Sequence, residues 1–254
     1  LAGYDAIVLT RERTRMTASL LARLPHLRLL SQTGKVAGHI DIAACTRLGI
    51  AVSEGEGTGA ATAELAWALI LASRRNLVEE ALRLRRGQWQ GTVGQQVRGQ
   101  RLGVWSYGRI GKQVAQYGKA FGMDVWVWGG EGSLAQASAD GLPIAPSRER
   151  FFGDSDVLTL HLRLSERTRG VVSAEDLRRM KPTALLVNTS RAELIASGVL
   201  ADALRDGRPG HAAVDVFEHE PVDSAQEPLL QLPNALCTPH LGYVEKDNYE
   251  RYFG

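Results

Sequence analysis

The sequence predicts an α/β fold built on a doubly wound parallel sheet. Short apolar segments of strand length alternate with segments of helical periodicity, and the alternation becomes regular after Leu102. Glycine and proline follow several predicted helices, as at Pro25, Gly49 and Pro182. The chain has 254 residues, of which 44% are apolar and 23% charged. This composition excludes an intrinsically disordered protein.

In the first part of the chain, the pattern predicts strands at 5–10, 27–31 and 50–52, and helices at 17–24, 40–47 and 58–74. The last helix has no polar side chain over residues 65–71. We therefore expect it to be buried on nearly all sides, in a domain interior or a subunit contact. The basic segment 83–101, rich in Gly and Gln, has little periodicity and indicates a surface excursion.

The remainder of the chain shows the more regular alternation. Six strands are predicted, at 102–105, 125–128, 157–160, 185–188, 212–216 and 235–237. The helices predicted between them are at 109–121, 148–152, 174–180 and 197–205. Six strands joined by crossovers favour a doubly wound sheet.

Charge and cysteine content narrow the class of protein. A net charge of +2 provides no basic face for nucleic acid, so we expect no such partner. No apolar run approaches the roughly 18 residues of a membrane helix, and residues 1–5 lack a signal-peptide pattern. Two cysteines, Cys45 and Cys237, are typical of a reducing compartment, so we expect a cytoplasmic protein. No cluster has metal-ligand spacing, and we expect no metal.

Residues 106–111, Ser-Tyr-Gly-Arg-Ile-Gly, follow a predicted strand and open a predicted helix. Free N–H groups and the positive end of the helix dipole favour a pyrophosphate at such a place. Gly108 would let the backbone approach a phosphate, and Gly111 would let helix and strand pack closely. Ser106 stands where the first glycine is expected, and serine adopts unusual backbone angles less easily. A tight turn without a ligand is the alternative interpretation.

The end of the next strand bears on the choice of cofactor. An acid there would hold the ribose diol of NAD. The sequence has Gly129 and Gly130 at this place, and Glu131 lies two residues late. The small residues leave room for a 2′-phosphate, but no neighbouring arginine is present. NAD and NADP both remain open as cofactors.

Several motifs together resemble the D-isomer-specific 2-hydroxyacid dehydrogenases. They occur in that family's order at 106–111, 159–161, 188–191, 215–221 and 238–242, and segments 32–34 and 61–64 are also similar. The resemblance covers almost the whole chain. It implies an oxidoreductase that transfers a hydride between a nicotinamide cofactor and a small D-2-hydroxy acid or 2-oxo acid.

The resemblance also implies two domains. The Rossmann-type cofactor domain would comprise residues 58–243, and a smaller flavodoxin-like substrate domain would combine 1–57 with 244–254. We expect that smaller domain to be incomplete, without the first β–α unit and the final helix of the family. The helix at 58–74 and Trp89 suggest the surface of a homodimer, as in the family.

Three residues are the predicted catalytic group. His240 would be the acid–base, since imidazole titrates near physiological pH. Glu220 would orient that imidazole and favour its charged form. Arg191 would grip the substrate carboxylate with its planar fork of donors. The alternatives are a loop histidine, a surface acid and a salt-bridged arginine at a helix start.

The resemblance assigns further contacts. The cofactor contacts are Thr62, Ser106, Gly108, Arg109, Ile110, Gly129, Gly130, His161, Thr189, Ser190, Arg191, Asp215, His240 and Gly242, with Asp215 at the nicotinamide carboxamide. The substrate contacts are Thr33, Gly34, Lys35 and Val36, together with Arg191. Two other functions stay open: a dinucleotide-sensing, corepressor-like binding protein on the same fold, and a catalytically weakened homologue.

Overall fold

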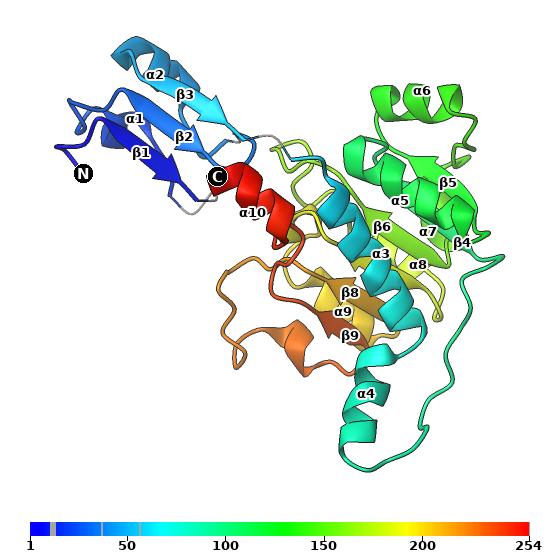
Figure 1. The fold of residues 1–254 in the computed structure, drawn as a ribbon. Helices are drawn as coiled ribbons and strands as arrows, with labels where there is room; N and C mark the ends of the chain where they lie inside the picture. Colours follow the sequence, from blue (N-terminus) through cyan, green and yellow to red (C-terminus); the bar gives the residue numbers. More distant parts are fainter. Residues whose placement is uncertain (11–13, 37, 56, 254) are drawn as a thin grey trace. The chain divides into compact units, whose positions relative to one another are not determined.

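The computed structural model describes residues 1–10, 14–36, 38–55 and 57–253. The chain forms two compact units (Figure 1). The smaller unit combines Leu1–Thr58 with Val244–Gly254, and the larger unit is Gly59–Tyr243. The chain therefore passes from one unit to the other twice.

The smaller unit has a parallel sheet of three strands in the order β1-β2-β3. Its elements are β1 (Ala6–Leu9), α1 (Ala18–Leu21), β2 (Leu29–Gln32), α2 (Ile42–Leu48), β3 (Ala51–Glu54) and α10 (Lys246–Phe253). The Thr17 hydroxyl accepts a hydrogen bond from the Leu20 N–H at the start of α1. Gly49 ends α2 in the left-handed conformation, with φ of 70°. Helix α10 was not predicted from the sequence.

The larger unit contains a parallel sheet of six strands in the order β5-β4-β6-β7-β8-β9. They are β4 (Arg101–Trp105), β5 (Asp124–Trp128), β6 (Val157–Leu160), β7 (Leu185–Asn188), β8 (His211–Val214) and β9 (Ala235–Cys237). The order reverses between β4 and β6, which confirms the doubly wound arrangement. Leu160 pairs with Asn188, Asn188 with Val214, and Val214 with Cys237. The residues that follow these strands therefore share one edge of the sheet.

Helices cover both faces of this sheet (Figure 1). One face packs against α3 (Ala60–Arg74) and α5 (Arg109–Ala120), with α6 (Glu131–Ala139) beside β5. The other face packs against α7 (Arg148–Asp154), α8 (Ala174–Arg179) and α9 (Val199–Arg205). Two short 3₁₀ turns follow β7 and precede β9, at η1 (Ala192–Leu194) and η2 (Pro228–Gln231). Strand residues alternate between the cores: Val187 faces the first and Leu186 the second.

Two helices of the larger unit were not predicted. Helix α4 (Leu77–Arg85) has no buried residue, so no packed apolar face marks this helix in the sequence. Helix α6 has the sequence EGSLAQASA, in which glycine, serine and alanine leave no apolar stripe. Helix α3 is buried over most of its surface, although Glu64 and Ala68 are exposed.

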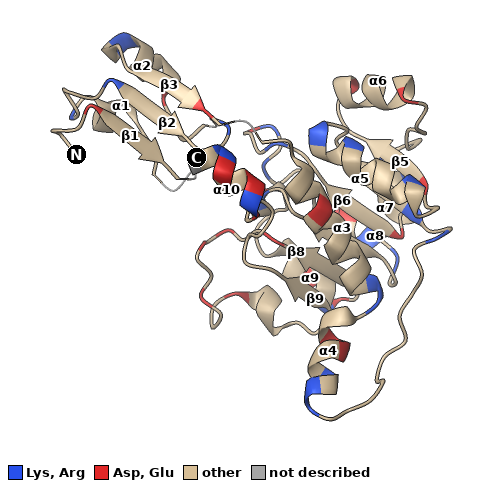
Figure 2. Ribbon diagram, viewed as in Figure 1, with Lys and Arg blue, Asp and Glu red and all other residues tan. Residues whose placement is uncertain are grey.

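Basic and acidic residues are interspersed over the elements of both units (Figure 2). Helix α10 carries both signs and contains the Lys246–Glu250 ion pair. Within the described residues, no helix is long and apolar enough to cross a membrane.

Candidate active site

The loops that follow the six strands of the larger unit bring most of the predicted residues to one edge of the sheet. Parallel strands point their carboxyl ends the same way, and open α/β sheets bind ligands at that edge. The first residues after β4, β5, β6, β7, β8 and β9 are Ser106, Gly129, His161, Thr189, Asp215 and Thr238. Five of these six were predicted as cofactor contacts.

His240 and Glu220 form a close pair. The Nδ1 of His240 lies 2.8 Å from Oε1 and 2.7 Å from Oε2 of Glu220. The Phe217 N–H also donates to Oε1 of Glu220, at 3.1 Å, which fixes the carboxylate on its own loop. The side chains of His240 and Glu220 are 18% and 31% exposed, so the pair lies at a surface that a small molecule can reach.

The backbone of His240 is in the left-handed region, with φ of 55°. Its N–H donates to the Thr238 carbonyl at 2.9 Å, which closes a tight turn. The Tyr243 ring meets the imidazole edge to face, with centroids 5.7 Å apart. A non-glycine residue with positive φ persists only where its surroundings hold it, and such residues cluster at functional sites.

Asp215 fixes the turn that contains His240 through hydrogen bonds. Its carboxylate is fully buried. Oδ1 accepts from the Thr238 hydroxyl at 2.6 Å and from the Leu241 N–H at 2.7 Å, and Oδ2 accepts from the Gly242 N–H at 2.8 Å. These bonds bracket His240 on both sides. Asp215 thus organises the loop that presents the imidazole.

The start of α3 adds a further link to this loop. The Thr62 hydroxyl donates to the Gly242 carbonyl at 2.7 Å. A side chain at Gly242 would meet Asp215 Oδ2 at 3.2 Å and Thr62 at 3.4 Å. Thr62 and Gly242, each predicted as a cofactor contact, are therefore in direct contact, and position 242 favours glycine because space is short.

Arg191 lies on a turn that Asn188 organises from within. The Asn188 side chain is buried; its Oδ1 accepts from the Ser190 N–H at 3.0 Å, and its Nδ2 donates to the Arg191 carbonyl at 2.9 Å. The Ser190 hydroxyl donates to the Leu160 carbonyl at 2.8 Å and joins the turn to β6. The Arg191 guanidinium donates to the Ser190 carbonyl at 2.7 Å and is half-buried.

The predicted phosphate loop connects β4 to α5. Gly108 caps α5 without a side-chain hydrogen bond, and a Cβ placed there would meet no atom within 4 Å. A Cβ at Gly111 would lie 2.1 Å from the Ser106 carbonyl oxygen, so only glycine allows this close packing. Arg109 and Ile110 form the first turn of α5, where N–H groups lack helical partners. Ser106 has φ of 79°, the conformation that glycine usually supplies.

Two buried polar atoms near the ends of β6 and β7 have no hydrogen-bond partner among the described residues: Nδ1 of His161 and Oγ1 of Thr189. The Nε2 of His161 lies 3.0 Å from the Thr159 hydroxyl. Burial lowers the pKa of His161 to about 3, so this imidazole stays neutral at physiological pH. Unsatisfied buried polar atoms in native proteins call for an explanation, and a bound ligand at this edge provides one.

At the end of β5, Gly129 and Gly130 lead directly into α6. A Cβ at Gly129 would meet the Ser133 Cβ at 3.1 Å, and one at Gly130 would meet nothing within 4 Å. Glu131 is exposed in the first turn of α6. The strand end thus carries no acid on its own two residues.

The predicted substrate loop follows β2 in the smaller unit. The Thr33 N–H donates to the Leu9 carbonyl at 3.1 Å, and the Val36 N–H donates to Glu54 Oε2 at 2.9 Å. Lys35 forms an ion pair with the same carboxylate. Within the described residues, the backbone N–H groups of Gly34 and Lys35 have no partner. The two central residues of this loop therefore provide the N–H groups that are available to a ligand.

Sequence reasoning missed three residues that hold these loops: Asn188, Glu54 and Tyr107. An asparagine as the last residue of an apolar strand was a usable signal for the first. Glu54 and the Tyr107 phenol act on partners 18 and 33 positions away, and no spacing rule reaches that far.

Comparison with known proteins identifies the family. Residues 67–242 match the sequence model for the NAD binding domain of D-isomer specific 2-hydroxyacid dehydrogenases. A glyoxylate reductase from Aeropyrum pernix is 37% identical over 92% of this chain and 72% of its own length. A D-3-phosphoglycerate dehydrogenase from Methanocaldococcus jannaschii is 33% identical over 93% of this chain but 45% of its own length. The crystal structure of a putative D-3-phosphoglycerate dehydrogenase from Ralstonia solanacearum is 50% identical, with a TM-score of 0.92 over 100% of this chain and 78% of its own.

The chain belongs to the D-isomer-specific 2-hydroxyacid dehydrogenase family, whose members transfer a hydride between NAD(H) and a 2-hydroxy or 2-oxo acid. This confirms the resemblance and the fold class inferred from the sequence. The larger unit fits the cofactor on its own observations. The uncapped start of α5, the open space at Gly108 and the orphaned atoms of His161 and Thr189 suit a phosphate-bearing, polar ligand.

The strain at Ser106 generates a prediction. Ser106→Gly should tighten NADH binding by about fivefold, because glycine adopts the left-handed conformation without a penalty of about 1 kcal/mol. Titration of NADH fluorescence checks the dissociation constant. Ser106→Ala is the matched control: it keeps the Cβ and should not tighten binding. Weaker binding by the glycine variant would show instead that the serine hydroxyl contacts the cofactor.

Proposed function

We propose that this protein reduces a small 2-oxo acid to the D-2-hydroxy acid, and catalyses the reverse oxidation, with His240 as the acid–base. The observation that carries the proposal is the imidazole of His240, held at Nδ1 by both oxygens of Glu220 on a left-handed turn. Such an arrangement fixes the ring orientation, and Nε2 is the nitrogen that would exchange a proton with the substrate. The family membership of the chain supports the reaction type.

The chain's own residues would supply the proton for the reduction. NADH or NADPH, when bound, supplies the hydride for the substrate's carbonyl carbon. Protonated His240 then gives a proton from Nε2 to the carbonyl oxygen, which otherwise would carry a full negative charge. The Glu220 carboxylate stabilises the imidazolium before that transfer. In the oxidation direction, neutral His240 accepts the proton from the hydroxyl group.

Substrate orientation is proposed for hydrogen-bond donors in each unit. Arg191 would grip the substrate carboxylate and polarise the carbonyl, since its planar guanidinium matches two oxygens. Thr33, Gly34, Lys35 and Val36 are the proposed substrate contacts of the smaller unit, where the N–H groups of Gly34 and Lys35 are the open donors among the described residues.

The nucleotide would lie along the carboxyl edge of the larger unit's sheet. The N–H groups at the start of α5, including those of Arg109 and Ile110, would hold the pyrophosphate. The remaining proposed contacts are Thr62, Ser106, Gly108, Gly129, Gly130, His161, Thr189, Ser190, Arg191, Asp215, His240 and Gly242. Asp215 is proposed to accept a hydrogen bond from the nicotinamide carboxamide through Oδ2, which one N–H of this chain already uses.

The two units would divide these tasks, the larger as nucleotide domain and the smaller as substrate domain. We also propose that the protein is cytoplasmic. Both cysteines are free, and burial raises the pKa of the Cys237 thiol to about 11, so it stays protonated and unreactive.

The pH dependence of the reduction provides the sharpest test of the catalytic pair. Reduction consumes a proton, so reductive kcat/KM should fall as pH rises. Glu220→Gln keeps the shape but removes the charge that stabilises the imidazolium. The pH profile of the reduction should therefore move to lower pH in this variant, and that of the oxidation should move with it. His240→Gln should lower kcat by about 10² to 10⁴.

The assay follows nicotinamide absorbance with glyoxylate, hydroxypyruvate, pyruvate and 3-phosphohydroxypyruvate. Glu218→Gln is the matched control, because Glu218 is an exposed acid on the same loop as Glu220. Equal profiles for wild type and Glu220→Gln would remove Glu220 from the catalytic pair. Tight NADH binding without turnover of any 2-oxo acid would overturn the proposed enzymatic activity and favour a dinucleotide-sensing protein.

Cofactor choice follows from the missing acid at the end of β5. We expect NADPH to be used, with a preference for NADH below about 10³-fold in kcat/KM, or roughly 4 kcal/mol. Gly129→Asp should shift that ratio toward NADH by at least about tenfold, since its charge repels a 2′-phosphate. Gly129→Ala causes the same crowding against Ser133 without charge and should leave the ratio unchanged. A larger wild-type preference for NADH would contradict the expectation.

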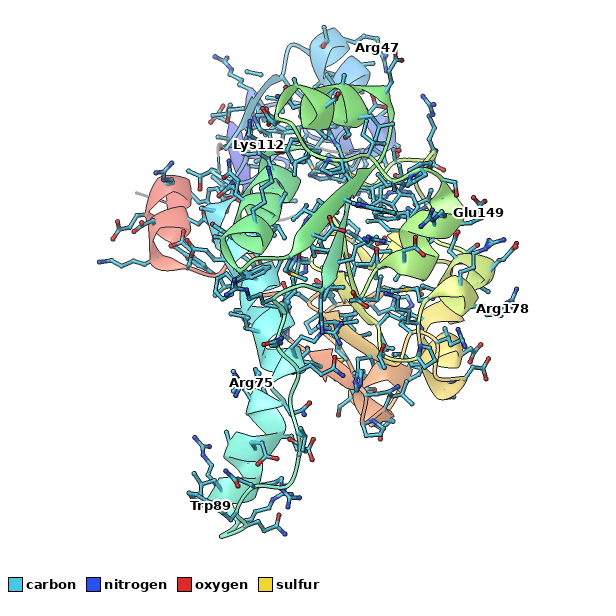
Figure 3. The ribbon with its side chains drawn as sticks, turned by 90° about the vertical axis from the view of Figure 1, so that its right-hand side faces the viewer. Arg47, Arg75, Trp89, Lys112, Glu149 and Arg178 are labelled. Carbon is cyan, nitrogen blue, oxygen red and sulfur yellow. The ribbon has the colours of Figure 1, made fainter. Side chains whose placement is uncertain are left out.

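A homodimer is the proposed assembly, and the arm of residues 75–100 is its proposed contact. Helix α4 on this arm is without a buried residue, and Leu82, Trp89 and Val93 are 44%, 74% and 94% exposed. Figure 3 shows Trp89 at the end of the arm farthest from Arg75. Exposed apolar surface of this kind marks an interaction site, and a second copy would cover it.

Sedimentation should give twice the mass of one chain. The double variant Leu82→Glu, Trp89→Ser should give a monomer, because it places charge in the contact and removes its largest apolar side chain. Leu48→Glu, on an exposed leucine of the smaller unit, is the control and should remain dimeric. A wild-type monomer, or a dimer that survives the double variant, would contradict this assignment.

A further inference from the structure

The phosphate loop contains a serine in a conformation suited to glycine, and something must hold it there. Ser106 has φ of 79°, which costs a non-glycine residue free energy in the folded state. Its N–H donates to the Trp128 carbonyl at 2.7 Å, which fixes one side of the residue to β5. The other side is the peptide to Tyr107, and this residue is anchored at two points.

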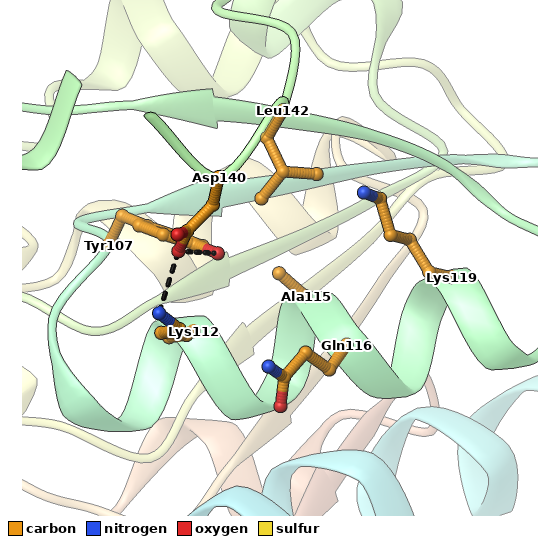
Figure 4. A pocket seen from close by; sticks show the side chains of 7 residues that line it. All are labelled: Tyr107, Lys112, Ala115, Gln116, Lys119, Asp140 and Leu142. Carbon is orange, nitrogen blue, oxygen red and sulfur yellow. Dashed lines mark hydrogen bonds and ion pairs between the residues drawn. The ribbon is translucent and has the colours of Figure 1, made fainter. Parts of the chain in front are cut away.

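Tyr107 is fixed at its backbone and at the tip of its side chain. The Tyr107 N–H donates to the Ser133 hydroxyl of α6 at 3.1 Å. The phenol is buried and donates to Asp140 Oδ2, at the end of α6, at 3.0 Å. Figure 4 shows the phenol and the Lys112 side chain converging on the Asp140 carboxylate. The residue after Ser106 is thus tied to both ends of α6.

The same carboxylate ties α6 to α5. Lys112, in the first turn of α5, contacts Asp140 Oδ2 at 2.7 Å, and Gln136 donates to Oδ1 at 3.3 Å. The Lys112 and Tyr107 hydrogen bonds lower the pKa of Asp140, so it is charged at neutral pH. Burial and Asp140 raise the pKa of Tyr107 to about 12, so the phenol remains a donor over the whole working pH range.

We propose that Tyr107 is a positioning residue of the cofactor site: its Asp140 and Ser133 hydrogen bonds hold Ser106 in the left-handed conformation that the phosphate loop requires. The network compensates for the absent first glycine. This inference rests on the proposed placement of the nucleotide at the start of α5. Tyr107 acts through Ser106 and need not touch the cofactor.

The alternative role of Tyr107 is to stabilise the larger unit independently of Ser106. The two roles differ in how Tyr107 and Ser106 depend on one another. If the phenol opposes the strain of Ser106, removing that strain with glycine removes most of the need for the phenol. If the phenol is only a packing contact, its loss costs the same whichever residue stands at position 106.

The experiment measures the dissociation constant of NADH for wild type, Tyr107→Phe, Ser106→Gly and the double variant. Tyr107→Phe should weaken binding about fivefold in the wild-type background and less than about twofold in the Ser106→Gly background. Tyr117→Phe is the control: this half-buried tyrosine of α5 packs on Trp67, and its hydroxyl has no partner in the described chain. It should leave the constant unchanged.

Two further readouts separate positioning from stability. At saturating NADH, kcat of Tyr107→Phe should stay within twofold of wild type. Hydrogen exchange of the amides at 106–111 in the protein without cofactor should accelerate in Tyr107→Phe and less so in the double variant. If Tyr107→Phe is poorly folded, Asp140→Ala removes the same acceptor from an exposed position and should show the same dependence on Ser106.

The same loss of NADH affinity in both backgrounds, or no loss in either, would overturn the inference while leaving the proposed function in place. A wild-type protein that binds no NADH would overturn both. An equal loss in Tyr117→Phe would show that the effect is not specific to the network.

Discussion

The buried carboxylate of Asp215 is the interaction on which the presentation of the imidazole depends. It is fully enclosed and accepts three hydrogen bonds from the segment 238–242, which comes from the next strand of the sheet. A buried carboxylate without partners would be costly, so its bonds and the course of that segment are linked. The segment has to curve around Asp215, and His240 takes a left-handed conformation at the bend. The pairing with Glu220 follows from this curvature.

The larger unit uses the same physical device at two places. Ser106 after β4 and His240 after β9 are both non-glycine residues with positive φ, and the N–H of the residue that follows each one donates to a side chain of another segment. In each case, a buried or half-buried side chain from another strand or helix fixes the adjacent residues. Local backbone preference is thus overruled at two loops of the proposed site, which is where a protein can use strain.

The sequence predicted the sheet better than the loops. Strands β6, β7 and β9 were predicted to the residue, because each is a short apolar run with clear boundaries. Helices α4 and α6 were missed, since neither buries an apolar face that would create a pattern. Glu220 and His240 are 20 positions apart, and only their motifs indicated a pair. The roles of Glu54 and of the Tyr107 phenol arise from tertiary contacts, which periodicity and spacing do not encode.

The smaller unit includes a helix from the far end of the chain. A Cβ on Gly55 would lie 3.4 Å from Tyr252, so α10 packs on the segment after β3. During synthesis, residues 1–58 leave the ribosome before the larger unit, and α10 emerges after it. Domains fold as units, so the larger unit can complete its sheet while the smaller one still lacks α10. Helix α10 therefore joins the three strands of the smaller unit only after the whole larger unit has been synthesised.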